Sequence, residues 1–233
     1  MNLEQKKRDS WRMFNRIARR YDLLNRLLSF KRDVAWRKRL IDQIPQGEAT
    51  VVVDLASGTA DVLLALINRH REVRAAVGVD PALGMLAVGR QKAHGTPIAL
   101  VNGDAHHLGL KSNSAQVMTL AFGIRNVADM AAAFGEIRRV LTRGGRLLIL
   151  EFSQPENRFM RAVYLVYLRH IMTLIGGMIT GDAAAYRYLN RTVEEFPYGE
   201  RFCELLQKAG FVDVGRTSLT FGVATIYSAQ NPY

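Results

Sequence analysis

The chain has 233 residues, of which 48% are hydrophobic, and it carries a formal net charge of +11. A chain of this length fits one large α/β domain with a substantial buried core, so two independent domains are not expected. Cys203 is its only cysteine, which excludes an intramolecular disulfide and a cysteine-based metal site and suits a reducing cytosol. No apolar core follows Met1, so we expect no secretory signal.

The positive charge is concentrated in residues 1–40, which hold 13 lysines and arginines against four acidic residues. Such a block can meet a phosphate-rich partner, either nucleic acid or anionic lipid. A solvated helix surface is the simpler alternative. In the same segment apolar residues recur at three- and four-residue steps from Trp11 to Leu28, which predicts one amphipathic helix. Residues 34–44 predict a second helix.

From residue 50 short apolar runs alternate with helical stretches. This alternation predicts a parallel sheet with helices on both faces. The runs are rich in Val, Leu, Ile and Ala throughout, which is typical of strands buried on both sides. The expected order is strand 50–55, helix 62–69, strand 75–80, helix 84–94, strand 98–102, strand 117–122, helix 130–141 and strand 146–152.

A helical insertion is expected over residues 156–195, followed by a helix at 200–209. The apolar stretch Ala162–Thr180 has the length of a membrane span, but Arg169 and His170 lie at its middle. An arginine at the centre of a spanning helix costs roughly 2.5–3.5 kcal/mol on insertion scales. We therefore interpret this stretch as a pair of covering helices.

The C-terminal residues predict two antiparallel strands, 214–220 and 223–229, with a short turn between them. A parallel sheet that ends in an antiparallel pair is the sheet of Rossmann-like class I methyltransferases. We therefore predict one α/β domain with a seven-stranded, mostly parallel sheet, an antiparallel C-terminal strand and a helical lid. Its parts are an N-terminal helical lid (1–45), a cofactor-binding core (50–153), a helical insertion that adds to the lid (154–198) and a C-terminal unit (199–233).

A turn of small residues follows the first strand, in the stretch Asp54-Leu-Ala-Ser57-Gly58-Thr59-Ala60-Asp61. Small side chains let the backbone approach a ligand at the carboxyl edge of an open α/β sheet. Neither the GxGxxG nor the GxxxxGK[ST] phosphate-binding pattern occurs there. Asp54 would repel a pyrophosphate, but its charge suits a ligand with an ammonium and a sulfonium group. The stretch therefore predicts S-adenosylmethionine, with Asp54, Ser57 and Gly58 as candidate binding residues.

Two more acidic residues stand at strand ends. Asp80 ends the next strand, 22 residues after Gly58, and a carboxylate there can accept both ribose hydroxyls. Asp104 follows the third strand and is placed to meet an adenine amino group. Each of the three aspartates could instead cap the following helix. Three of them in order, with this spacing, favour a cofactor site.

Four segments together resemble the ubiquinone/menaquinone biosynthesis C-methyltransferase family. The resemblance covers nearly the whole chain, and all but the third segment are specific to that family. It implies that Thr59, Asp80, Asp104, Ala105 and Ala121 line the methyl-donor site. The four segments are 13–30 with its Tyr21-Asp22…Asn25 motif, FGIRNV at 122–127, residues 139–153 with Gly144-Gly145-Arg146, and YRYL at 186–189 with Phe196-Pro197.

The resemblance also implies a reaction, the methylation of a ring carbon of a prenylated hydroquinone such as demethylmenaquinol or a ubiquinol precursor. The ring carbon attacks only after a neighbouring phenol has lost its proton, so the enzyme needs positioning, a route for that proton and a dry cleft. Arg125 and Asn126 follow the fourth strand and are expected beside the methyl group. Arg125, which stays protonated, could stabilise the phenolate and hold a proton-accepting water, and Tyr21 could bond the other ring oxygen. A salt bridge of Arg125 to Glu151 and core packing of Tyr21 are the alternatives.

The helices of 1–45 and 156–195 are expected to cover the acceptor. The basic face of the lid would rest on anionic lipid, where a prenylated substrate resides. We therefore expect a cytoplasmic enzyme, peripheral to the inner face of the membrane, with no nucleic-acid partner; a homodimer is left open. Apolar lid residues that could line a channel for the isoprenoid tail are Leu27, Leu28, Tyr164, Leu165, Met172 and Ile175.

Two rival functions differ from this one. A methyltransferase of RNA would suit the basic charge, but the [DN]PP[YF] motif of base methyltransferases is absent after the fourth strand; a methyltransferase of another small molecule is a further alternative. A cofactor-binding paralogue without catalysis is supported by Ala60, where the family usually has glycine, and by Ala121, where serine is common. If position 60 needs a positive φ, which glycine adopts more readily than alanine, this turn binds the cofactor differently from the turn of the family. His106 and His107 are expected to be loop residues rather than ligands, and no metal is expected.

Overall fold

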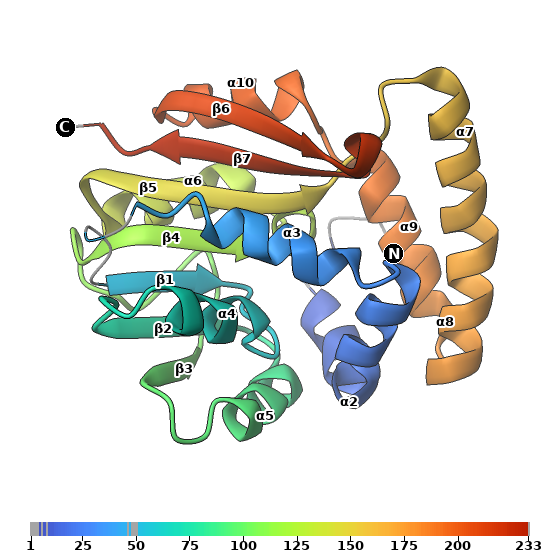
Figure 1. Ribbon diagram of the computed structural model, residues 1–233, viewed down its shortest axis with the longest axis horizontal. Helices are drawn as coiled ribbons and strands as arrows, with labels where there is room; N and C mark the ends of the chain where they lie inside the picture. Colours follow the sequence, from blue (N-terminus) through green and yellow to red (C-terminus); the bar gives the residue numbers. More distant parts are fainter. Residues whose placement is uncertain (1–4, 6, 8, 46, 48–50, 233) are drawn as a thin grey trace.

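The computed structural model describes residues 5, 7, 9–45, 47 and 51–232. Its strands are β1 (Val51–Leu55), β2 (Ala75–Asp80), β3 (Ile98–Asn102), β4 (Ala115–Ala121), β5 (Leu141–Phe152), β6 (Val212–Leu219) and β7 (Ala224–Gln230). They form one seven-stranded sheet in the order β3-β2-β1-β4-β5-β7-β6 (Figure 1). The first five are parallel, whereas β7 runs antiparallel to both β5 and β6. The predicted mostly parallel sheet with an antiparallel C-terminal pair is confirmed.

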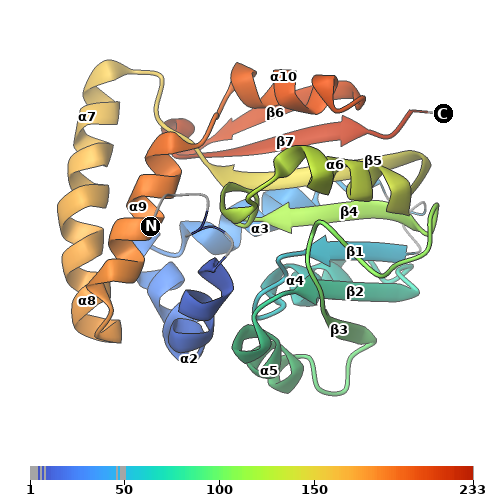
Figure 2. The same cartoon turned by 180° about the vertical axis from the view of Figure 1, so that it is seen from behind.

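Helices cover both faces of this sheet. They are α3 (Arg32–Ile41), α4 (Asp61–Arg69), α5 (Leu83–Lys92), α6 (Met130–Val140) and α10 (Glu200–Lys208). The face seen in Figure 1 carries α3 and α4, and the face seen in Figure 2 carries α6 and α10. Because side chains alternate across a strand, Val52 packs in the cluster of α3 and α4, and Val53 packs in the cluster of α6 and α10. Strands buried on both faces explain their near-continuous apolar sequences.

The predicted elements of the core are all present, with small differences at their ends. β2 and β3 have the predicted bounds, and Thr50, the predicted start of β1, lies outside the described residues. β5 begins at Leu141 rather than at residue 146, because Leu141 already pairs with Ala115 ahead of an irregularity in the register. Periodicity in the sequence does not show such an irregular start.

β1 lies at the centre of the sheet, between β2 and β4. The chain winds outward from β1 through β2 to β3 and then crosses back to β4 on the other side of β1. The segments that follow β1 and β4 therefore leave the sheet in opposite directions, which opens a crevice at its carboxyl edge. Open α/β sheets bind ligands at such a point, so the small-residue turn after β1 stands in the binding position.

The helical insertion forms one long rod with a second helix beside it. α7 (Arg158–Val166), the π-helical η2 (Tyr167–Met172) and α8 (Thr173–Thr180) are continuous, and α9 (Ala183–Glu195) returns next to them (Figure 1). The prediction of a helix pair within 162–180 is therefore wrong. The chain reverses only at Gly181, which caps α8 with a φ of 74°.

Glycine within the rod serves packing rather than a turn. A Cβ at Gly176 would lie 2.4 Å from the ring of Tyr186, so glycine there lets α8 approach α9 closely. The rod is otherwise largely exposed. A 22-residue part of it, Arg158–Ile179, is long and apolar enough to cross a membrane by length and composition alone, and 22% of its most apolar window is buried.

Buried charges attach α2 (Ser10–Leu28) and α3 to the start of α4. Arg26 of α2 pairs with Asp33 and also with Asp61, its Nη2 lying 2.6 Å from Asp61 Oδ2. Arg37 of α3 pairs with Asp33 at 2.5 Å. Burial would raise the pKa of Asp61, but Arg37, Lys92 and Arg26 outweigh burial and lower it. Arg26 and Arg37 of the basic N-terminal segment therefore hold the helices in place. For these two residues the alternative of a solvated helix surface is wrong.

Ala60 provides a test of backbone strain in the turn. It has a φ of 66° and is fully buried at the N-cap of α4. The left-handed region costs a non-glycine residue roughly 1–2 kcal/mol, so we expect Ala60→Gly to maintain or raise the free energy of unfolding. Ala131→Gly, on an exposed position of α6, should lower it by about 1 kcal/mol. Urea unfolding measures the free energy of unfolding of both variants. An equal loss in the two would show that the backbone of Ala60 is not strained.

Candidate active site

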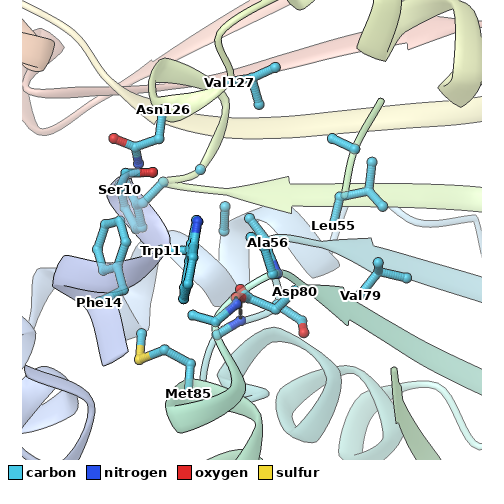
Figure 3. A pocket seen from close by; sticks show the side chains of 18 of the residues that line it. Ser10, Trp11, Phe14, Leu55, Ala56, Val79, Asp80, Met85, Asn126 and Val127 are labelled. Carbon is cyan, nitrogen blue, oxygen red and sulfur yellow. Dashed lines mark hydrogen bonds between the residues drawn. The ribbon is translucent and has the colours of Figure 1, made fainter. Parts of the chain in front are cut away.

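A cavity of about 570 Å³, here called the first cavity, opens at the carboxyl ends of β1, β2 and β4. Trp11 and Phe14 line it from α2, and Trp11 lies between Phe14 and Ala56 in the view of Figure 3. Its volume lies in the range of small-molecule sites. The fold brings together in its wall all the predicted cofactor-binding residues, which are Asp54, Ser57, Gly58, Thr59, Asp80, Asp104, Ala105 and Ala121.

Asp80 holds the small-residue turn against the end of β2. Its Oδ2 accepts a hydrogen bond from the Gly58 backbone N–H at 2.9 Å, and its Oδ1 accepts one from the Ala82 N–H at 2.7 Å. Burial raises the pKa of Asp80 to about 6, although these two N–H groups act to lower it. Each carboxylate oxygen can accept a further hydrogen bond, so the pair suits the two hydroxyls of a ribose.

Asp54 and Ser57 lie deeper in the same wall. Asp54 is 1% exposed and accepts a hydrogen bond from Thr119 Oγ1 at 2.5 Å. Burial raises the pKa of Asp54 to about 7, while Thr119 and Arg37 act to lower it. Ser57 Oγ is buried and has no hydrogen-bond partner within the part of the chain that the structure describes. An unpaired buried hydroxyl beside a cavity fits a site built for a polar ligand.

Helix capping does not account for the three aspartates. α4 and α5 have alanine at their N-caps, and Asp54 bonds a neighbouring strand instead of a helix. Asp104 lies exposed at the rim of the cavity, in a turn, and accepts a hydrogen bond from the His106 backbone N–H at 2.9 Å. His106 and His107 belong to that turn, and no cluster of three potential metal ligands occurs in the described ranges.

A second cavity, of about 390 Å³, lies between α2, α3, α9 and the rod. It shares Phe14, Tyr21 and Phe122 with the first cavity, so the two spaces adjoin. Most of its wall is apolar. Of the six residues predicted to line a channel, the described wall contains Leu28, Tyr164 and Met172, whereas Leu27 is 48% exposed.

Arg125 lies in the wall of the second cavity rather than the first. It is 2% exposed, and its Nη1 donates to Glu151 Oε1 and to the Phe122 carbonyl oxygen, both at 2.6 Å. The alternative considered for Arg125, a salt bridge to Glu151, is therefore present. Phe122 has a φ of 59°, a strained conformation of the kind found at functional sites. Burial raises the pKa of Glu151 against the opposing effect of Arg125.

Tyr21 lines both cavities and so lies where they meet. Asn126 lies in the wall of the first cavity. The ring of Tyr21 packs edge-on against Phe14, with centroids 5.9 Å apart, and burial raises the pKa of its hydroxyl. Tyr188 Oη donates to Asn126 Oδ1 at 3.1 Å. The sequence patterns did not single out Tyr188, and its place in the YRYL segment was the available signal.

The fold and the first cavity together define a class, the S-adenosylmethionine-dependent methyltransferases. Solved structures of the same fold include such a methyltransferase from Thermotoga maritima, with a TM-score of 0.69, 18% identity, and coverage of 95% of this chain and 99% of that chain. Phosphoethanolamine N-methyltransferase 2 of Haemonchus contortus with bound S-adenosylmethionine matches with a TM-score of 0.63 and 15% identity, over 87% of this chain and 53% of that one.

The chain belongs to the ubiE/COQ5 methyltransferase family, whose model matches residues 2–231. It is 43% identical over 222 residues to a demethylmenaquinone methyltransferase of Thermus thermophilus, covering 94% of this chain and 100% of that one. It is 40% identical over 222 residues to a ubiquinone/menaquinone biosynthesis C-methyltransferase of Geobacter sulfurreducens, covering 94% and 86%. The resemblance drawn from four segments is confirmed: the chain is an S-adenosylmethionine-dependent C-methyltransferase.

The pH dependence of cofactor binding tests Asp54. With a pKa of about 7, its carboxyl group is mostly protonated at pH 6 and mostly charged at pH 8. A charged carboxylate attracts the ammonium and sulfonium of S-adenosylmethionine, so the affinity should rise by up to about tenfold over this range. Asp54→Asn should lose most of this dependence. Calorimetric titration measures it, and the same pH slope in both proteins would show that Asp54 is not responsible.

Proposed function

We propose that this methyltransferase acts on a ring carbon of a prenylated hydroquinone, either demethylmenaquinol or a ubiquinol precursor, in quinone biosynthesis. The observation that carries the proposal is the apolar second cavity, which adjoins the first at Phe14, Tyr21 and Phe122. A ring at that junction would meet the methyl donor, and its tail would extend along the apolar wall. The names of the relatives from Thermus thermophilus and Geobacter sulfurreducens support the same acceptor class. An apolar cavity does not suit an RNA nucleotide.

The residues of the first cavity fit S-adenosylmethionine, the cofactor of this family. Asp80 would accept the ribose hydroxyls, Asp104 and Ala105 would meet the adenine, and the turn with Ser57 and Gly58 would lie against the amino-acid end. The unpaired Ser57 hydroxyl supports this fit. When bound, the cofactor supplies an electrophilic methyl group on a sulfonium.

The acceptor side would be organised by three residues. Tyr21 and Asn126 lie close enough to the junction to bond ring oxygens, and the raised pKa of Tyr21 keeps its hydroxyl protonated and able to donate. Arg125, fixed by its bonds to Glu151 and Phe122, presents a positive charge where a phenolate would form. The apolar wall excludes bulk water, which strengthens this attraction. A water beside Arg125 would accept the phenolic proton.

Methyl transfer from ¹³C-methyl-labelled S-adenosylmethionine tests the proposed function. With short-chain demethylmenaquinol as the acceptor, we expect an NMR signal from a methyl group bonded to a ring carbon. RNA offered as the acceptor should stay unlabelled. Labelled RNA with unlabelled quinol, a methyl group on oxygen, or no transfer to either acceptor would contradict the proposal.

The role of Arg125 requires a paired substitution. Arg125→Ala alone leaves Glu151 buried without a counter-charge, at a cost of roughly 3–5 kcal/mol. We therefore expect Arg125→Ala combined with Glu151→Gln to fold, to bind S-adenosylmethionine with nearly wild-type affinity, and to lose turnover by about 100-fold or more. Glu151→Gln alone keeps the guanidinium and should retain more turnover. Cofactor affinity that falls in step with activity would rule out this role.

We also propose that the enzyme works in the cytoplasm, docked on the inner face of an anionic membrane. Phe30 lines the second cavity, is 77% exposed, and lies against Tyr167 of the rod with ring centroids 6.3 Å apart. Phe221, 81% exposed, follows Thr220, which also lines this cavity. The second cavity thus reaches the surface beside exposed apolar side chains, and the rod carries further ones. The exposed ones on the rod include Phe159, Val163, Val166, Leu174 and Met178.

A bilayer fits this surface for two reasons. Lys31 and Arg32 follow Phe30 and are exposed, which suits anionic headgroups. A prenylated acceptor resides in lipid, so a cavity that opens onto the bilayer could receive its tail without passage through water. The basic face of α2, expected to rest on lipid, contributes less, since Arg16 pairs with Asp182 and Arg26 with buried carboxylates.

Sedimentation with phosphatidylglycerol vesicles tests the docking surface. We expect the wild-type protein to bind and to dissociate partly as salt screens the headgroups. Phe30→Ser combined with Phe221→Ser should weaken binding at least about tenfold, because a buried phenylalanine contributes roughly 1.5–3 kcal/mol. Val101→Ser, on the edge strand β3, is the control. No binding, binding that salt does not weaken, or a dimer in solution that covers these side chains would contradict the proposal.

A further inference from the structure

Two buried polar groups in the wall of the second cavity are unpaired. Tyr164 Oη and Arg125 Nε have no hydrogen-bond partner within the described residues. Both side chains line the cavity, and Tyr164 is 9% exposed and Arg125 2% exposed. A buried donor without a partner destabilises a protein, and native structures keep few of them. Two such donors in one wall point to a ligand that pairs with both.

These two donors come from different elements. Tyr164 is in α7 of the rod, and Arg125 is in the 3₁₀ turn η1 (Ile124–Asn126) after β4. Arg125 cannot turn freely, because Glu151 and the Phe122 carbonyl oxygen hold its Nη1. Burial raises the pKa of the Tyr164 hydroxyl well above its ordinary value, although Arg125 acts to lower it. At neutral pH the wall therefore presents one neutral hydroxyl donor and one fixed cationic donor.

We propose that Tyr164 and Arg125 together bind one oxygen of the acceptor ring and form a two-donor site for the phenolate. The inference rests on the proposed function, since it takes the ligand to be a hydroquinone. A phenol oxygen that has lost its proton is negatively charged and accepts several hydrogen bonds. Donors fixed in an apolar wall stabilise such a charge more than water does. The site would thus select acceptors with a free ring hydroxyl and reject their aryl ethers.

Neighbouring tyrosines do not share this property. Tyr167, one turn along the rod, donates its hydroxyl to the Leu28 carbonyl oxygen at 2.6 Å. Other titratable or charged groups of the wall are Tyr21 from α2, Arg32 and Asp33 from α3, and Tyr186 from α9, with Glu151 of β5 behind Arg125. Asp33 is neutralised by Arg26 and Arg37. Among the described residues that line this wall, Tyr164 is therefore the tyrosine whose buried hydroxyl has no hydrogen-bond partner.

Tyr164→Phe tests the proposal, because it removes only the unpaired hydroxyl. We expect the melting temperature to rise by roughly 2–4 °C, since an unsatisfied buried group is lost. S-adenosylmethionine affinity should not change. In contrast, kcat/KM for short-chain demethylmenaquinol should fall by about 10- to 100-fold, and the acidic limb of its pH profile should move up by about one unit, because the phenolate loses a donor.

Tyr227→Phe is the matched control. Tyr227 lies in the core, away from both cavities, and its Oη accepts a hydrogen bond from the Gly199 backbone N–H at 2.7 Å. This variant should melt at a lower temperature and keep the wild-type kcat/KM and pH profile. A higher melting temperature with lower kcat/KM in Tyr164→Phe, against a lower melting temperature with unchanged kcat/KM in Tyr227→Phe, would support the proposal.

Failure of the two-donor site and failure of the proposed function give different results. If the wild-type enzyme methylates the quinol and Tyr164→Phe matches it in kcat/KM and in pH profile, the two-donor site is wrong and the proposed function stands. If the wild-type enzyme does not methylate the quinol at all, the proposed function fails and takes this inference with it. A monomethyl ether of the quinol gives a second reading: Tyr164→Phe and wild type should differ less on the ether than on the free quinol, and an equal loss on both would overturn the proposal.

Discussion

Both cavities depend on the reversal of winding at β1. Because β2 and β4 flank β1 and all three are parallel, the segments that follow them emerge at one edge of the sheet and part between β1 and β4. The segment after β1 carries Gly58 and Thr59, and the segment after β4 carries Phe122 and Arg125. The donor and acceptor groups of the proposed reaction therefore face one crevice from its two sides.

Partly buried charges complete the site by fixing the N-terminal helices over this crevice. Asp61, at the start of α4, is bound by Arg26 of α2 and by Lys92 of α5, and Lys92 also lies 2.7 Å from Asp22 Oδ2. Asp22 in turn accepts a hydrogen bond from Thr59 Oγ1 at 2.6 Å. Such ion pairs are weak evidence for stability, but together they hold these side chains in one geometry. Since α2 contributes to both cavities, this cluster connects the cofactor turn with the acceptor side.

The cofactor side could be predicted from the sequence because its signals are local. Asp54 and Asp80 each end an apolar run, and parallel strands necessarily bring such ends to one edge. The acceptor side could not, since the unpaired hydroxyl of Tyr164 and the bond from Tyr188 to Asn126 depend on how α7 and α9 pack. Helical periodicity shows which face is apolar but not which neighbour it meets. The sequence does not predict the continuous rod for the same reason. Glycine at position 176 is explained only by the close approach of Tyr186 from α9, which is a tertiary contact.

The structure of a ternary complex tests most directly whether donor and acceptor occupy two adjoining cavities. The complex would contain S-adenosylhomocysteine and a short-chain demethylmenaquinol analogue. We predict that the adenosine lies against Asp80 and Asp104, the ring at Phe14 and Phe122, and the prenyl tail inside the second cavity. A tail that leaves through the first cavity or lies in solvent, with the second cavity empty, would contradict it.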